Sequence, residues 1–139
     1  MIAPKVRLFL ATMGLLILGC LPSIAAEAGV LEATICSISS DPQSFDGKIV
    51  LLHGQLNSDG IENTNITNKS CESYGIAIVT PTHFKGEARY IRTLQTGHPG
   101  TLDKTITGTF VGRFIWQPRK IPKRVLELKE VRDISVVMK

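Results

Sequence analysis

Alternation of apolar and polar side chains predicts most of the secondary structure of this chain. Residues 48–56 alternate with a period of two, which is typical of a strand with one buried face. Ser58-Asp59-Gly60 follows and predicts a two-residue type I′ hairpin turn, because Asp-Gly readily adopts the positive φ angles that this turn needs. Residues 61–67 are expected to return as the second strand.

The middle of the chain predicts one more short strand and a helix. Residues 75–80 are apolar and end at Pro81, which favours a third strand. Residues 87–95 carry apolar side chains three positions apart and are followed by Gly97, which predicts a helix with a firm stop. Ahead of the first strand, residues 35–40 could form a short helical turn.

Two long strands are expected to complete the fold. Residues 104–116 give the clearest period-two pattern of the chain. Gly108 and Gly112 lie on the apolar side of this strand, which predicts a tight bend where two backbones approach closely. The last strand is expected over two stretches, broken or bulged near Arg132-Asp133: residues 125–128 and 134–137.

This order of elements favours one fold class, all-β with one helix. Three strands, a helix and two further strands are the order of the five-stranded OB-fold barrel. A small open α+β sheet is the alternative. The OB-fold-like barrel is preferred because closure removes the exposed edges that short strands would otherwise leave.

The N-terminus has the features of a targeting segment. Lys5 and Arg7 precede an apolar run over residues 8–18, and small residues lead up to Ala26. This is the pattern of a secretory signal peptide covering residues 1–26, with a single domain over 27–139. Ile17-Leu18-Gly19-Cys20 also resembles a bacterial lipobox, in which Cys20 would be lipidated after removal of residues 1–19. Both processing routes remain open, and both export the protein.

Composition narrows the class of protein further. The 139 residues are 43% hydrophobic and 20% charged, which excludes a disordered, collagenous or repeat protein and fits one globular domain. Charge is unevenly distributed along the chain. From Val111 onward there are eight bases against three acids, whereas residues 27–110 hold six bases against nine acids.

Two cysteines remain beyond the N-terminal segment. Cys36 and Cys71 would enter an oxidising compartment, where such a pair most simply forms a disulfide. A catalytic or metal-binding pair is the alternative, but the chain lacks the C-x-x-C spacing and nearby histidines typical of those sites. We therefore expect a structural disulfide.

A wider pattern of residues extends over most of the chain after the N-terminal segment. It consists of Ile35-Cys36, Pro42-x-x-Phe45-Asp46-Gly47-Lys48-x-Val50, Gly54, Asp59-Gly60-Ile61-Glu62, Cys71, Gly75-Ile76-Ala77, Gly108-Thr109-Phe110-x-Gly112-Arg113-Phe114 and Val125-Leu126-Glu127-Leu128. This pattern resembles a group of small exported bacterial proteins of uncharacterised function. The resemblance implies a bacterial envelope protein with an OB-like barrel and a paired Cys36 and Cys71, and it implies no activity and no catalytic residue.

The chain lacks the common catalytic and cofactor-binding motifs. The chain has no G-x-S-x-G elbow, H-E-x-x-H helix, Walker-type loop or EF-hand, so hydrolase and nucleotide-binding functions lose their usual support. His53, His83 and His98 are far apart and predict no metal site. Two sequons, at Asn65 and Asn68, are interpreted as a polar loop. We therefore expect that the protein is not an enzyme and that it has no catalytic residue, cofactor or metal ion.

One candidate binding patch lies between the last two strands. The only tryptophan, Trp116, stands beside four cations: Arg119, Lys120, Lys123 and Arg124. In OB-folds the corresponding loop flanks the ligand groove, and cations beside a stacking aromatic suit an anionic polymer. The alternative is that Trp116 belongs to the core and the cations only keep a protruding hairpin soluble.

These features predict two functions of different classes. The first is a non-enzymatic binding module of the periplasm or cell envelope, with an anionic glycan, a lipid headgroup or nucleic acid as ligand. The second is a structural or protein-interaction module that docks on an envelope protein through the outer strand face around Ile49, Leu51 and His53.

Overall fold

The computed structural model describes residues 29–71 and 74–139. The expected signal segment and Cys20 lie outside the described residues. The elements are, in order, β1 (Leu31–Glu32), α1 (Ile35–Ser40), the 3₁₀ turn η1 (Pro42–Phe45), β2 (Ile49–Ser58), β3 (Thr64–Thr67), the 3₁₀ turn η2 (Lys69–Cys71), β4 (Ile76–Val79), α2 (Glu87–Gln95), β5 (Lys104–Trp116) and β6 (Arg124–Met138).

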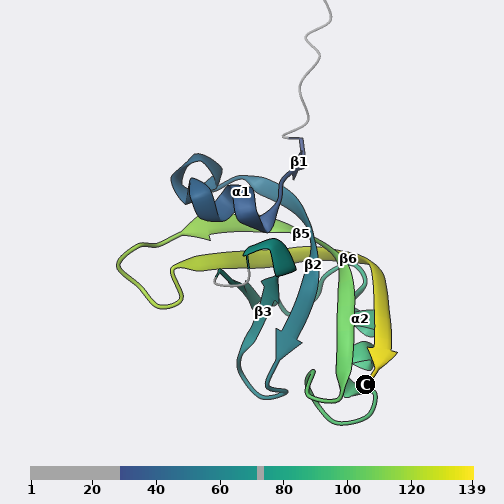
Figure 1. Cartoon of the computed structure of the whole chain (residues 1–139). Coiled ribbons are helices and arrows are strands. Elements are labelled where there is room, and N and C mark those ends of the chain that lie inside the picture. Colours follow the sequence, from purple (N-terminus) through teal and green to yellow (C-terminus); the bar gives the residue numbers. More distant parts are fainter. Residues whose placement is uncertain (1–28, 72–73) are drawn as a thin grey trace, which may run out of the picture.

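The strands form one mixed sheet whose hydrogen bonds close into a ring (Figure 1). Strand β2 pairs antiparallel with β3, and β3 pairs antiparallel with β4. Strand β4 runs parallel to β6, β6 pairs antiparallel with β5, and β5 returns to β2. Strand β1 pairs in parallel with the start of β2, at Val50 and Leu51. The ring therefore brings strands that are distant in the sequence side by side, as it does β4 and β6.

The mostly-β class and the elements expected from the pattern are confirmed, but the strand count and order differ. The sheet has six strands because β1 precedes the five that the alternation predicts. Strand β1 is two residues long and exposed, so no alternation of burial marks it in the sequence. It is held by backbone pairing to β2, extended by the Ala33 N–H donating to the Leu51 carbonyl at 3.1 Å.

The β2–β3 connection is a hairpin, but the two-residue turn was a wrong prediction. Ser58 pairs with Thr64, so the loop has five residues, 59–63, and β3 begins three positions later than expected. The Asp59 carboxylate accepts hydrogen bonds from the backbone N–H groups of Ile61, Glu62 and Asn63 at 2.8–3.0 Å. These bonds, with one from the Asn63 side chain, lower the pKa of Asp59 to about 2. The aspartate thus organises a wider loop instead of a tight turn.

The core fills the inside of the ring with the side chains that the alternation placed there. Strands β2, β5 and β6 supply most of it, α2 adds Tyr90, and α1 adds Ile35 and Ile38. Burial raises the pKa of Tyr90 to about 12. The fully buried hydrophobic residues of β2 and β5 are Val50, Leu52, Leu56, Ile106, Phe110 and Phe114.

Strands β5 and β6 bend sharply together, as the glycines on β5 predict (Figure 1). A Cβ at Gly112 would lie 2.3 Å from the Glu127 carbonyl oxygen, so only glycine permits this approach. The register shifts twice between the strands, and the irregularity expected near Arg132-Asp133 is present as a bulge: Asp133 has φ +50 and lies at one of the two shifts. The bend sends the β5–β6 hairpin away from α2, to the left in Figure 1.

The expected disulfide is present. Cys36 of α1 is bonded to Cys71 of η2, with a Cα–Cα distance of 5.6 Å. It closes a loop of about 36 residues, which in the chain-entropy model stabilises the fold by about 3–4 kcal/mol. The bridge fixes α1 against the connection that leads into β4.

Candidate ligand-binding site

The loop between β5 and β6, residues 117–123, is an ordered structure and is called the basic loop below. The Gln117 N–H donates to the Lys123 carbonyl at 2.8 Å, and the Gln117 side-chain amide donates to the Pro122 carbonyl at 2.6 Å. At its base, the Trp116 N–H donates to the Asp46 carboxylate at 2.9 Å. Backbone and side-chain hydrogen bonds therefore fix this loop without a ligand.

An aromatic–cation stack lies at the base of the basic loop. The Arg124 guanidinium carbon is 5.6 Å from the centre of the Trp116 ring and 5.0 Å from the centre of the Tyr74 ring. Both distances are in the range of cation–π interactions. The Nε of Arg124 is buried and has no hydrogen-bond partner among the described residues. The Arg124 guanidinium therefore lies close to two aromatic rings.

Trp116 has two kinds of neighbour. Its side chain is partly buried and packs against the hydrophobic core, as the core interpretation of this residue expects. Its ring also contacts Arg124, one of the four cations of the predicted binding patch. Tyr74, which is 44% exposed, was not predicted from the sequence as part of this site. It precedes β4, and no spacing rule links a residue there to the β5–β6 hairpin.

The other three predicted cations extend into solvent. Arg119, Lys120 and Lys123 are exposed. Among residues 29–71 and 74–139, ion pairs join His53 to Glu32, His83 to Glu87, and Lys85 and Arg132 to Glu130, and none includes a cation of the basic loop. The structure thus brings Trp116 and Arg124 together and leaves three neighbouring positive charges for solvent or a ligand.

A second candidate is a polar groove around His53. The His53 Nδ1 lies 2.8 Å from the Thr109 hydroxyl oxygen, and Nε2 lies 3.8 Å from a Glu32 carboxylate oxygen. Two shallow pockets of about 510 and 270 Å³ share His53 and Asn68 as lining residues. Thr109 is only 5% exposed, and the carboxylates of Glu32 and Asp133 line the two pockets beside hydroxyl and amide groups.

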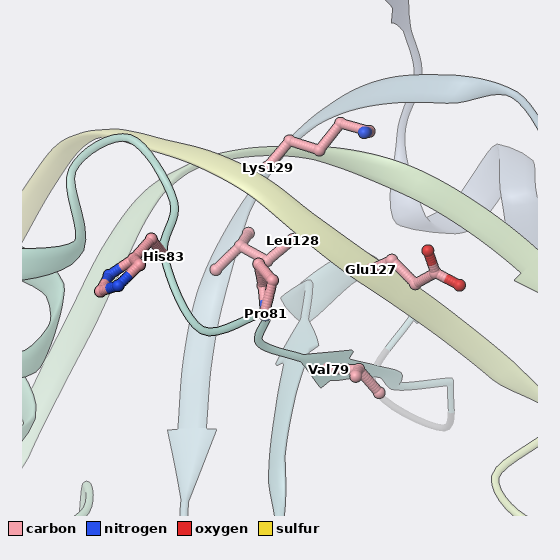
Figure 2. Close-up of a pocket in the computed structure, with 6 residues that line it drawn as sticks. All are labelled: Val79, Pro81, His83, Glu127, Leu128 and Lys129. Atoms are coloured by element: carbon pink, nitrogen blue, oxygen red, sulfur yellow. The ribbon is translucent and has the colours of Figure 1, made fainter.

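A third pocket lies between β4 and β6, with a volume of about 520 Å³. Val79, Pro81 and Leu128 supply its apolar surface. Figure 2 shows the His83 side chain extending to the left and those of Glu127 and Lys129 extending to the right, with their polar ends apart. Groups that act together on a substrate must converge on one point, and these do not.

The other features considered from the sequence are metal sites, membrane-spanning helices and the two sequons. Among the described residues, no three His, Cys, Asp or Glu side chains are grouped closely enough to hold a metal ion. In the same residues, no helix has the length and hydropathy needed to cross a bilayer. Asn65 lies in β3, and Asn68 accepts a hydrogen bond from the Ser70 N–H at 2.9 Å in a turn.

The outer face that was expected to dock on a protein is only partly open. Ile49 and Leu51 are half-buried, whereas His53 is exposed. No protein-family model matches this chain, and no curated protein or solved structure is significantly similar to it. Its function has to be inferred from the charge and geometry of the described residues.

Proposed function

We propose that this protein is a non-enzymatic binding module of the bacterial cell envelope that holds an acidic ligand or polymer at the basic loop. One observation carries the proposal. Arg119, Lys120 and Lys123 are exposed, have no ion-pair partner among the described residues, and stand on a loop that is already ordered. Because the backbone of the loop is already fixed, an anion that binds these cations incurs no further cost of ordering the loop.

The fold supports a binding role for this loop. In the proposal, the ring β2-β3-β4-β6-β5 is an OB-like barrel and β1 is an added edge strand. The basic loop then corresponds to the loop between the fourth and fifth barrel strands, which in OB-folds flanks the ligand groove. The neighbouring stack of Tyr74, Arg124 and Trp116 offers partly exposed ring surface beside the cations.

Export to the envelope is proposed on the N-terminal pattern and is compatible with the Cys36–Cys71 disulfide. The intact mass of the protein recovered from cells separates the two processing routes, because lipidation at Cys20 and cleavage after Ala26 give very different masses. The acidic ligand classes available in that compartment are glycans, lipid headgroups and extracellular nucleic acid.

The test compares two triple variants that lose the same charge. Arg119/Lys120/Lys123→Gln removes the exposed cations of the basic loop and keeps Arg124 in its stack. Arg89/Arg92/Lys129→Gln removes three exposed cations from α2 and β6. Each is titrated with single-stranded DNA, an acidic glycan and vesicles containing phosphatidylglycerol, over a range of salt concentrations.

We expect the basic-loop variant alone to lose binding. For single-stranded DNA, the slope of log K against log salt should fall in magnitude by about 2, because each phosphate contact contributes about 0.7. Equal weakening in both variants would mean that only net charge matters, and unchanged binding in the basic-loop variant would refute the proposal.

A further inference from the structure

The tip of the basic loop carries an apolar side chain between its cations. Ile121 is 97% exposed, more than any other large hydrophobic residue that the structure describes. Pro118 and Pro122 beside it are exposed as well. Lys120 precedes Ile121 and Lys123 follows Pro122, so apolar and positive groups share one small surface.

A soluble polyanion complements the positive charge of this surface but not its apolar side chain. Glycans and phosphodiester backbones supply negative charge but no aliphatic environment for an isoleucine. A bilayer with anionic phospholipids supplies both, because its phosphates lie at the surface and its acyl chains begin about 5–10 Å below. Basic residues at the headgroups with an aliphatic side chain beneath them are the arrangement that such an interface favours.

The shape of the molecule allows this contact. The β5–β6 hairpin reaches beyond the other elements at the left of Figure 1, so the tip can meet a flat surface before the body does. The sequence from residue 112 to 126 holds no acidic residue, so no carboxylate within the hairpin end opposes an anionic surface.

Ile61 and Leu102, the two other large apolar side chains of the described residues that are more than four-fifths exposed, lack this charge pattern. Ile61 is 86% exposed and stands between Asp59 and Glu62 in the chain, and Leu102 is 84% exposed and precedes Asp103. Carboxylates beside them would be repelled by an anionic membrane. Of these three side chains, only Ile121 stands beside charges that are complementary to anionic lipid.

We propose that the basic loop docks on an anionic phospholipid bilayer, with Ile121 inserted below the headgroups and Arg119, Lys120 and Lys123 on the phosphates. The inference rests on the proposed function and narrows its ligand to lipid. Each cation near such a surface strengthens binding about fivefold, so three contribute about a hundredfold. Partial burial of one isoleucine contributes roughly a further tenfold.

The test measures binding of the purified protein to phosphatidylglycerol-containing vesicles, with pure phosphatidylcholine vesicles as the neutral surface. Ile121→Ser should weaken vesicle binding roughly tenfold, and Ile61→Ser, the matched variant at the acidic loop, should bind as the wild type does. Arg119/Lys120/Lys123→Gln should weaken binding about a hundredfold. Binding of single-stranded DNA should be unchanged in Ile121→Ser.

The outcomes separate this inference from the proposed function. If the wild type binds DNA or an acidic glycan but not the anionic vesicles, the membrane inference is wrong and the proposed function stands. Vesicle binding that Ile121→Ser leaves unchanged also overturns the insertion. If none of the acidic probes binds, both proposals fail.

Discussion

Lys104 is a lysine buried as deeply as the core hydrophobic residues. It is 1% exposed, and its ammonium group donates hydrogen bonds to the carbonyls of Leu94 and His98 at 2.8 and 2.9 Å and to the carbonyl of Thr96. These carbonyls belong to the end of α2 and the connection that follows it. A single side chain therefore joins the helix end to the start of β5.

Replacing Lys104 with Met should destabilise the protein by roughly 2–4 kcal/mol, because three carbonyls lose a charged donor. Chemical denaturation measures this loss. Lys129→Met removes an exposed lysine from β6 and should change the stability by less than about 0.5 kcal/mol. Equal stability of the two variants would contradict a structural role for the Lys104 ammonium.

Glu130 is the acidic centre of an ion-pair cluster on β6. It accepts two hydrogen bonds from Arg132 at 2.7 and 2.9 Å, and Lys85 lies 3.4 Å away. Arg132 first, and then Lys85, lower the pKa of Glu130 from its ordinary 4.5 to about 2. Lys85 precedes α2, and backbone hydrogen bonds also attach it to β6.

Acid should weaken the fold partly through Glu130. Its pKa is lower in the folded state than in the unfolded state, so the ionised carboxylate stabilises the protein above about pH 4.5 and this contribution is lost as the pH falls towards 2. Glu130→Gln should flatten the decline in stability over this window. Glu127→Gln, at an exposed carboxylate on the same strand, should keep the wild-type decline, and identical profiles for all three proteins would contradict this role.

At the scale of elements, the bend of β5 and β6 depends on one glycine more than on the other. A Cβ at Gly112 would meet the Glu127 carbonyl oxygen at 2.3 Å, whereas the nearest atom to a Cβ at Gly108 is 3.4 Å away. Gly112→Ala should therefore cost roughly 2–3 kcal/mol, and Gly108→Ala should cost under about 1 kcal/mol. Thermal unfolding compares them, and similar melting temperatures would show that the bend does not need the close approach.

The sequence predicts those elements whose burial follows a simple period. Strands β2 and β5 have one face inside the ring, so their alternation identifies both the strand and its inner residues. Strand β1 is too short to show a period and is held by backbone bonds. The five-residue loop after β2 escaped prediction because the Asp59 carboxylate can organise either a tight or a wide turn.

The candidate site was predictable only where its residues are close in the chain. Trp116 and the four cations lie within nine positions, so their clustering is visible in the sequence. Tyr74 reaches Arg124 through the parallel pairing of β4 with β6, and that pairing joins segments about fifty residues apart. Contacts created by such a pairing leave no local signal in one sequence.

At the scale of the whole molecule, the acidic β2–β3 loop and the basic loop lie at opposite ends of β5. The strand begins at Lys104, next to the connection that packs against the acidic β2–β3 loop with Asp59 and Glu62, and it ends at Trp116, where the basic loop begins. The exposed cations of the basic loop favour the approach of an anionic ligand at that end of β5. The proposed function depends on binding at that end.

The most direct test of this claim is an amide chemical-shift map of the isotope-labelled protein, with a sulfated heparin tetrasaccharide as a small acidic probe. The largest changes should fall on residues 117–124 and on the Trp116 and Tyr74 positions, and they should disappear at high salt. Changes centred on the His53 groove, or spread evenly over the exposed cations of α2 and β6, would contradict binding at the basic loop.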